Sequence, residues 1–240
     1  MNKTIGYLAL LTILVGGSVA HGDLVVSGVF DGPQSGGEPK VVELYAINDV
    51  DLSQYAIGAA NNGGGSDGVE TNLSGMAAAG SYIYVIEDNN FDGGAGALGD
   101  GFAAYFGFTP AILFDGSGST GAAAVNGNDA IEVFFDSTGA FTGAEIVVDT
   151  FGDINTDGSG EAWEYLDGWA YRNNNIGKNG SSFNVAEWTF SGINANDGQS
   201  SNGTAVTPFP IGTYTFAVPE PSTAAILSFG LIAGMIRRRR

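Results

Sequence analysis

The sequence predicts an all-β protein in which short strands form the two sheets of a β-sandwich. Several short runs are rich in β-branched and aromatic residues, and clusters of Gly, Asn, Asp and Ser separate them as turns separate strands. The 240 residues include 39 glycines, 44% apolar residues and no cysteine. The chain is therefore turn-rich, has enough apolar residues for a substantial core, and must hold that core without disulfides.

We expect eight strands, each bounded by turn-forming residues. They are Leu24 to Phe30, Lys40 to Ile47, Tyr55 to Ala59, Tyr82 to Glu87, Ala130 to Phe135, Glu145 to Phe151, Gly168 to Arg172 and Glu187 to Phe190. Asn61 to Gly68 and Asn89 to Gly101 are predicted loops, because Gly, Asn and Asp dominate them. Phe102 to Phe106 is expected to form one helical turn, and no longer stretch has helical periodicity.

The N-terminus has the three parts of a secretory signal peptide. Lys3 precedes an apolar run from Ile5 to Val15, and a small-residue sequence ending at Ala20 follows it. The run is far shorter than the roughly 20 residues that a membrane-spanning helix needs. Residues 1–20 are therefore predicted to be removed, and residues 23–217 to form one folded domain.

The C-terminus carries a second targeting pattern. Its parts are Pro219, Glu220 and Pro221, then an uncharged and mostly apolar run from Thr223 to Ile236, and finally Arg237, Arg238, Arg239 and Arg240. As a helix the apolar run would be about 21 Å long, short of the roughly 30 Å hydrocarbon core. We expect a short membrane anchor whose arginines stay on the cytoplasmic side.

This three-part order resembles the PEP-CTERM sorting signal of Gram-negative-type bacteria. The resemblance covers the last tenth of the chain. It implies that an exosortase-type processing enzyme recognises and removes the tail and that the protein is delivered to the outer surface or to an exopolysaccharide matrix. An ordinary tail anchor is the alternative, since hydropathy alone does not separate the two.

The order of strand-like segments resembles the lamin-tail domain, an immunoglobulin-like β-sandwich. Val42-Glu43-Leu44-Tyr45 and Asp51-Leu52-Ser53 carry most of the likeness, which runs over residues 23 to about 172. In bacteria such domains accompany extracellular nucleases or phosphatases, and this chain has no such catalytic domain. The extension from Asn173 to Thr215 departs from the pattern and is expected to add strands or to cover a sheet edge.

The charge of the predicted domain is strongly one-sided. Between residues 21 and 217 there are 25 acidic side chains, against the basic residues Lys40, Arg172 and Lys178. Such a surface repels the phosphate backbone, so nucleic acid is excluded as a partner. It suits an extracellular protein or one that collects divalent cations. Arg172 is expected to pair with a carboxylate or to lie on an aromatic face.

One acidic segment has the spacing of a calcium-binding loop. Oxygen-bearing side chains stand at positions 1, 3, 5, 7, 9 and 12, with Gly158 at position 6; the candidate ligands are Asp153, Asn155, Asp157, Ser159, Glu161 and Glu164. The segment follows a predicted strand and precedes no helix, so it is not an EF-hand. Two interpretations stay open: a strand-flanked Ca2+ site, or a turn in which the Asx side chains bond their own backbone.

Aromatic residues gather after this loop. They are Trp163, Tyr165, Trp169, Tyr171 and, further on, Trp188. We expect them to be core residues, because aromatic rings dominate the cores of β-sandwiches. The alternative is a stacking platform for the sugars of an exopolysaccharide.

Few catalytic mechanisms remain open. The chain has one histidine, His21, and no cysteine, so neither a Ser-His-Asp triad nor a cysteine nucleophile can form. A pair of carboxylates is possible, but acidic residues are too abundant for that to be informative. We therefore expect a non-catalytic surface or matrix module for adhesion or scaffolding. A carbohydrate-binding module and a carboxylate-based polysaccharide hydrolase are the alternatives.

Overall fold

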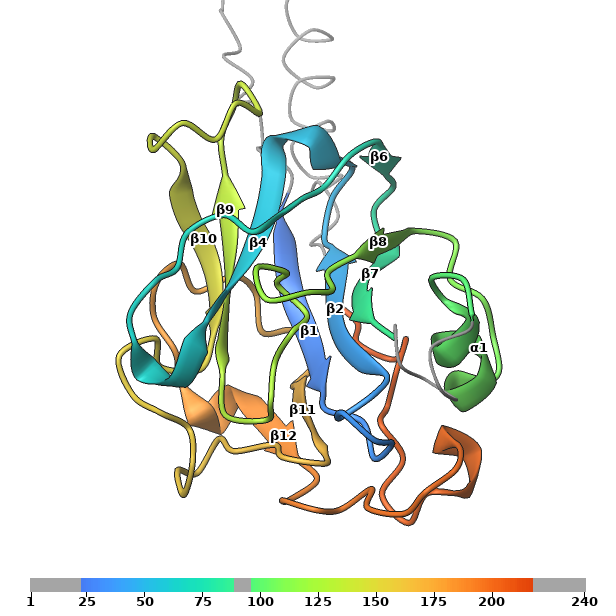
Figure 1. Ribbon diagram of the computed structural model, residues 1–240. Helices are drawn as coiled ribbons and strands as arrows, with labels where there is room; N and C mark the ends of the chain where they lie inside the picture. The colour runs from blue at the N-terminus through green and yellow to red at the C-terminus, as the bar shows by residue number, and fades with distance from the viewer. Residues whose placement is uncertain (1–22, 89–95, 218–240) are drawn as a thin grey trace, which may run out of the picture.

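The computed structural model describes residues 23–88 and 96–217, which form a mostly β body (Figure 1). All eight predicted strands are present, with ends within one residue of those expected: β1 (Leu24–Phe30), β2 (Lys40–Ala46), β4 (Tyr55–Ala60), β7 (Tyr82–Glu87), β9 (Ala130–Phe135), β10 (Ile146–Phe151), β11 (Trp169–Arg172) and β12 (Trp188–Phe190). The predicted signal peptide and membrane anchor lie outside the described residues.

Four shorter strands were not predicted. They are β3 (Val50–Asp51), β5 (Thr71–Asn72), β6 (Met76–Ala77) and β8 (Leu113–Asp115). Single turns of 3-10 helix are η1 (Leu52–Gln54), η2 (Asn61–Gly63), η4 (Val185–Glu187) and η5 (Asn202–Thr204). Two- and three-residue strands are too short to show an alternating pattern, which is why the sequence does not reveal them.

The larger sheet has six strands in the order β12-β11-β1-β2-β7-β8. Adjacent strands of this sheet are antiparallel. Between β1 and β2, Val26 lies opposite Leu44 and Val29 opposite Val42. The exception is β8, which lies parallel to β7. A parallel neighbour needs a long crossover, and the chain between β7 and β8 contains a short helix.

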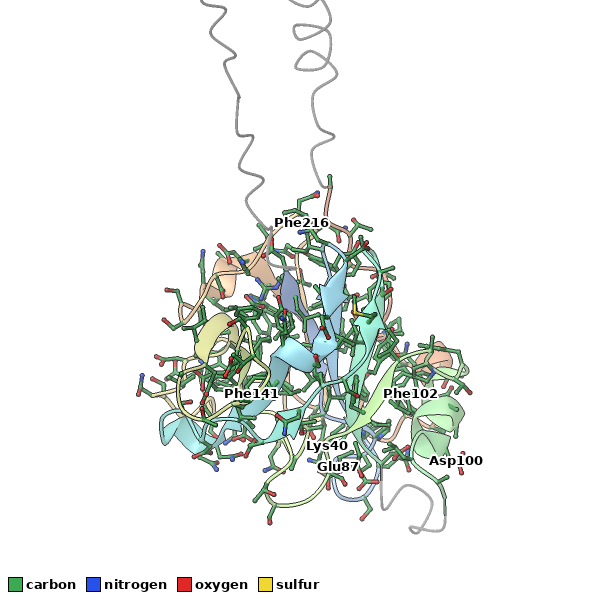
Figure 2. All side chains as sticks on the ribbon, turned by 90° about the horizontal axis from the view of Figure 1, so that it is seen from above. Lys40, Glu87, Asp100, Phe102, Phe141 and Phe216 are labelled. Atoms are coloured by element: carbon green, nitrogen blue, oxygen red, sulfur yellow. The ribbon has the colours of Figure 1, made fainter. Side chains whose placement is uncertain are left out.

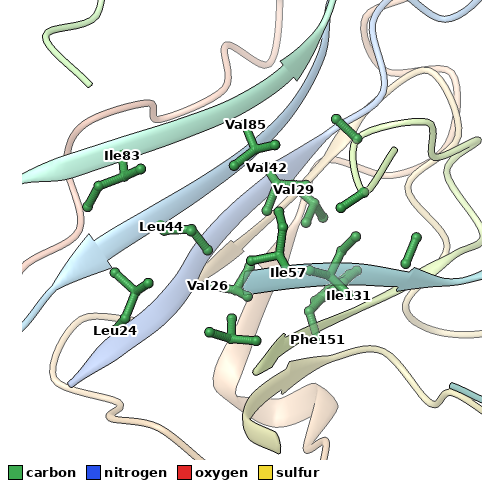
Figure 3. Packing of buried hydrophobic residues seen from close by; sticks show 14 of the residues in the cluster. Leu24, Val26, Val29, Val42, Leu44, Ile57, Ile83, Val85, Ile131 and Phe151 are labelled. Atoms are coloured by element: carbon green, nitrogen blue, oxygen red, sulfur yellow. The ribbon is translucent and has the colours of Figure 1, made fainter. Parts of the chain in front are cut away.

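The smaller sheet faces the larger one across a shared core. It has the order β10-β9-β4-β5, and β3 and β6 pair separately. Leu24, Val26 and Leu44 of the larger sheet join Ile57 and Ile131 of the smaller one in a single buried cluster (Figure 3). Because alternate residues of each strand point into this cluster, the two sheets pack as the layers of a sandwich.

The other face of the larger sheet is also buried. Every residue of β1 and β2 is buried, since a third layer covers the side chains that point away from the sandwich core. This layer consists of α1 (Asp100–Phe106) and the C-terminal arm, defined as residues 207–217. The extension after β11 was expected to add strands or to cover an edge; it adds β12, as expected, and its C-terminal arm covers a face of the sheet.

The helix α1 extends the helical turn that was predicted. It begins two residues earlier than expected because Asp88 accepts hydrogen bonds from the backbone N–H groups of Gly99 (2.9 Å) and Phe102 (3.2 Å) at its start. Gly107, with φ of 83°, ends the helix in the left-handed conformation that glycine favours. No helix in residues 23–88 and 96–217 is long and apolar enough to cross a membrane.

Candidate functional site

The predicted calcium loop, residues 153–164 (the acidic loop), packs against two neighbouring loops at one end of the sandwich. The N–H of Gly65 donates to the carbonyl of Ile154 (2.9 Å), and the side-chain amide of Asn128 donates to Asp157 (2.9 Å). Gly63 has φ of 71°, and a Cβ there would lie 2.3 Å from the backbone N of Asp157. Glycine at position 63 is therefore required for this contact.

The structure does not gather the six candidate ligands around one point. Asp153 accepts from the N–H of Asn155 (3.0 Å), Asp157 accepts from the N–H of Ser159 (2.9 Å), and Glu164 accepts from the N–H of Gly160 (2.7 Å). These are the local bonds of the turn interpretation. Within the described residues no group of three or more acidic or histidine side chains could hold a metal ion. The Ca2+ site stays a prediction.

Hydrogen bonds keep the carboxylate of Asp157 ionised. The N–H of Ser159 and the amide of Asn128 donate to it, and they lower its pKa below the ordinary value. Glu161, another of the candidate ligands, is exposed, and its side chain makes no hydrogen bond to a described residue.

A groove of about 790 Å³ lies beside this loop. The loop supplies one wall, and the segment that precedes η4 supplies the other. The lining residues are Thr150, Gly152, Asp153, Ile154, Asn155, Glu161, Ala162, Trp163, Ser181, Ser182, Phe183, Asn184 and Val185. The volume is within the range of small-molecule sites, roughly 300–1,000 Å³. Of the predicted site residues, the groove brings together Asp153, Asn155 and Glu161.

The clustered aromatic residues are core residues, as expected. The exposed fractions are 5% for Trp163, 0% for Tyr165, 8% for Trp169, 6% for Tyr171 and 5% for Trp188. Phe151 packs edge-on against Trp163 (6.0 Å) and Trp188 (4.6 Å) between ring centroids. Rings buried to this degree cannot form an exposed stacking platform, so that alternative is wrong.

Arg172 and Asp149 complete an edge of β1. Strand β11 pairs with β1 only over Gly28–Phe30, so the backbone of Val26 lacks a strand partner on that side. Asp149 accepts a hydrogen bond from the N–H of Val26 (2.8 Å), and Nε of Arg172 donates to the carbonyl of Val26 (2.6 Å). The two side chains thus satisfy buried backbone groups that would otherwise be unpaired.

The same two side chains form a fully buried ion pair. The Arg172 guanidinium is 2.6 Å from Asp149, both side chains are 0% exposed, and the guanidinium lies 4.6 Å from the ring centroid of Trp188. Burial raises the pKa of Asp149 to about 6, while Arg172 opposes the rise most strongly. The carboxylate is therefore ionised at pH 7. Arg172 pairs with a carboxylate and also lies on an aromatic face, so both expectations are confirmed.

Glu43 is the second buried carboxylate. It accepts from the hydroxyls of Ser27 (2.7 Å) and Tyr171 (2.8 Å) and from the N–H of Gly212 (2.7 Å), and Tyr84 is a further hydrogen-bond partner. Burial raises its pKa to about 7. Since Gly212 belongs to the C-terminal arm, Glu43 joins the arm to the centre of the larger sheet.

The C-terminal arm is bonded to the sheet along its length. The hydroxyl of Tyr171 accepts from the N–H groups of Thr213 (3.0 Å) and Tyr214 (2.8 Å), and the indole N–H of Trp169 donates to the carbonyl of Thr207 (2.8 Å). The arm's polar backbone groups are thus paired with side chains of β11.

Phe209 is the apolar anchor of the arm. It is 1% exposed and stacks on Phe30 at 5.4 Å. A Cβ at Gly28 would lie 2.7 Å from the rings of both Phe209 and Tyr171, so only glycine at this position leaves room for the arm.

One loop holds both ends of the described body. Asn175 donates its N–H to the carbonyl of Thr215 (2.9 Å) and accepts from the N–H of Ala217 (2.8 Å). Lys178 forms an ion pair with Asp23. In Figure 2, Phe216 lies at the opposite end of the body from Lys40 and Glu87. The loop 173–178 therefore fixes the first and last described residues at the same end.

Sequence reasoning missed Glu43, the groove and the docked arm. Glu43 had a signal, since it is a charged residue inside the otherwise apolar strand VVELYA, a pattern that indicates a buried, hydrogen-bonded group. The groove had no signal in the sequence, because its walls come from two separate segments, residues 150–163 and 181–185, that only the fold brings together.

Residues 217–240 match the PEP-CTERM protein-sorting motif. The match contains the predicted Pro219, Glu220 and Pro221 and the cluster from Arg237 to Arg240, so the sequence prediction of this motif is confirmed, although these residues lie outside the described ones. The motif implies an exported protein of Gram-negative bacteria that is directed to the cell surface and processed by an exosortase. No curated protein and no solved structure matches the chain, and no match supports the lamin-tail resemblance.

Proposed function

We propose that this chain is a non-catalytic structural module for the cell surface or its matrix, with an immunoglobulin-like, lamin-tail-like sandwich as its body. The observation that carries the proposal is that the sorting motif begins at a residue bonded to the body. Ala217 donates its N–H to the side chain of Asn175 and is also the first residue of the motif. The body is therefore joined directly to its sorting signal.

The short connection supports a role at a surface. One residue separates Ala217 from Pro219. Consecutive Cα atoms are 3.8 Å apart, so the Pro219 Cα lies within about 8 Å of the Ala217 Cα. A body attached through so short a segment stays close to the surface that holds it.

The described residues offer little for catalysis. The single histidine, His21, lies outside them, and the chain has no cysteine. A carboxylate-based hydrolase places two acids across its substrate, roughly 5–10 Å apart. The acids of the groove, Asp153 and Glu161, are both exposed, whereas such an acid is normally tuned by burial. These features favour a module that binds or supports over one that cleaves.

The arrangement of strands is consistent with the lamin-tail-like body. Of the two segments that carry most of the likeness, Val42-Glu43-Leu44-Tyr45 lies in β2 of the larger sheet, and Asp51-Leu52-Ser53 spans β3 and η1, directly before β4 of the smaller sheet. The C-terminal arm, which forms part of the third layer, lies outside the residues that the resemblance covers. We infer that this layer adapts the sandwich to carry a sorting motif at its end.

The sorting claim is tested by expressing the full chain in a Gram-negative host that has an exosortase. The wild-type protein is expected at the cell surface as a shortened chain by mass spectrometry. Pro219→Ala/Pro221→Ala is expected to leave a full-length chain in the inner membrane. The matched control is Pro208→Ala, an exposed proline of the arm. Full-length wild-type chain in the inner membrane would show the proposal to be wrong.

A further inference from the structure

The groove beside the acidic loop presents exposed polar side chains that are not hydrogen-bonded to any other described residue. Asn155, Glu161, Ser181 and Ser182 line it, all are exposed, and none of these side chains is hydrogen-bonded to a described residue. The four groups belong to both walls. They supply hydroxyl, amide and carboxylate groups, the usual partners of a ligand rich in hydroxyl groups.

The groove also has an aromatic base. Trp163 and the partly buried Phe183 both line it, with ring centroids 6.1 Å apart and planes at 70°. Phe151 packs edge-on against both rings, at 6.0 Å and 5.5 Å. Phe183 is thus held in place by the core rings behind it, so a ligand would meet a preformed apolar surface there.

Charge restricts the class of ligand. The groove contains Asp153 and Glu161 and no basic residue. The three basic side chains of the described body are engaged elsewhere, in the ion pairs Lys40–Asp31, Arg172–Asp149 and Lys178–Asp23. An anionic ligand would therefore be repelled. A bare cation is not favoured either, since no group of three acidic side chains gathers within the described residues.

We propose that this groove binds a neutral polysaccharide chain. Sugar hydroxyls would bond to the exposed polar side chains of the two walls, and the apolar face of a sugar ring would lie on the partly exposed ring of Phe183. The open shape suits a chain that continues beyond the groove, and the volume is enough for a short stretch of it. This goes beyond the proposed function, because sorting to the surface does not depend on it.

The test is surface plasmon resonance of the full-length chain, in mild detergent and excess chelator, over immobilised dextran, laminarin, galactomannan and alginate. Binding to at least one of the three neutral polysaccharides is expected, and none to anionic alginate. Glu161→Ala and Asn155→Ala are each expected to weaken binding about tenfold, as the loss of a hydrogen bond does. Glu161→Gln, which keeps the hydrogen-bonding capacity, is expected to bind within about threefold of wild type.

Ser182→Ala is paired with Ser200→Ala, because both serines are exposed and neither side chain is hydrogen-bonded to a described residue, but Ser200 does not line the groove. Only Ser182→Ala should weaken binding. The proposal is overturned by a lack of binding to all three neutral polysaccharides, by binding to alginate alone, or by equal affinity of wild type and the groove variants. A Glu161→Gln variant as weak as Glu161→Ala would show a charge-dependent site and overturn it too. Since each readout is direct binding, failure here leaves the sorting result unaffected.

Discussion

Replacing Arg172 by Met should strongly destabilise the body. The substitution removes the cation from a pair that is 0% exposed on both sides and leaves Asp149 as a buried, uncompensated charge. Breaking a buried pair in this way costs about 3–5 kcal/mol. For a domain of this size, about 2–4 °C of Tm is lost per kcal/mol, so the Tm should fall by about 6–20 °C. The carbonyl of Val26 also loses its donor, which adds to the loss.

The assays are urea unfolding, for the free energy, and thermal unfolding, for the Tm, of residues 23–217 at pH 7, each followed by tryptophan fluorescence. The matched control is Lys178→Met, which breaks the partly exposed pair with Asp23, where the cost should be about 0–1 kcal/mol. Adding Asp149→Asn to Arg172→Met should recover part of the loss, because it removes the stranded charge. A free energy of unfolding for Arg172→Met within about 1 kcal/mol of the wild-type value would refute the reasoning.

Three further changes have defined outcomes. The pKa of Glu43 rises from 4.5 to about 7 on folding. Its contribution to stability is therefore fully present below about pH 4.5 and is lost as the pH rises through about 7. Glu43→Gln should flatten the pH dependence of the free energy of urea unfolding over this window. Phe209→Ala should cost about 3–5 kcal/mol and expose the C-terminal arm to limited proteolysis with cleavage sites read by mass spectrometry, whereas an uncut arm would contradict its anchoring role. If the acidic loop binds Ca2+, excess calcium should raise the Tm relative to chelator and Asp157→Ala should abolish the rise; an unchanged Tm would leave the turn interpretation.

Local patterns were sufficient to predict eight of the twelve described strands, and one buried contact could be predicted from charge alone. The runs that became β1 and β2 are apolar and β-branched, so the strand prediction was correct to within a residue. Arg172 could be paired in advance because basic residues are scarce and a charge inside a strand needs a partner. Its partner Asp149 could not be named, since 23 residues separate the two.

Features that depend on distant segments were beyond sequence reasoning. Glu43 meets Gly212 across 169 residues, and nothing in either segment specifies the other. The arm contains Phe209 and Tyr214 but no alternating pattern, so its docking on a sheet face was not predicted. The spacing from Asp153 to Glu164 is a local pattern, yet it did not predict the geometry of the loop. Suitable ligand types at suitable positions do not determine whether the backbone turns them toward one point.

The loop 173–178 gives the body a direction. Asp23 directly precedes β1 and pairs with Lys178 of this loop, while the acidic loop lies toward the other end of β1 (Figure 1). The seven residues of β1 separate the two ends by about 23 Å. With the proposed attachment through Ala217, the end of the body at loop 173–178 would face the surface, and the acidic loop at the other end would face away from it, toward neighbouring molecules.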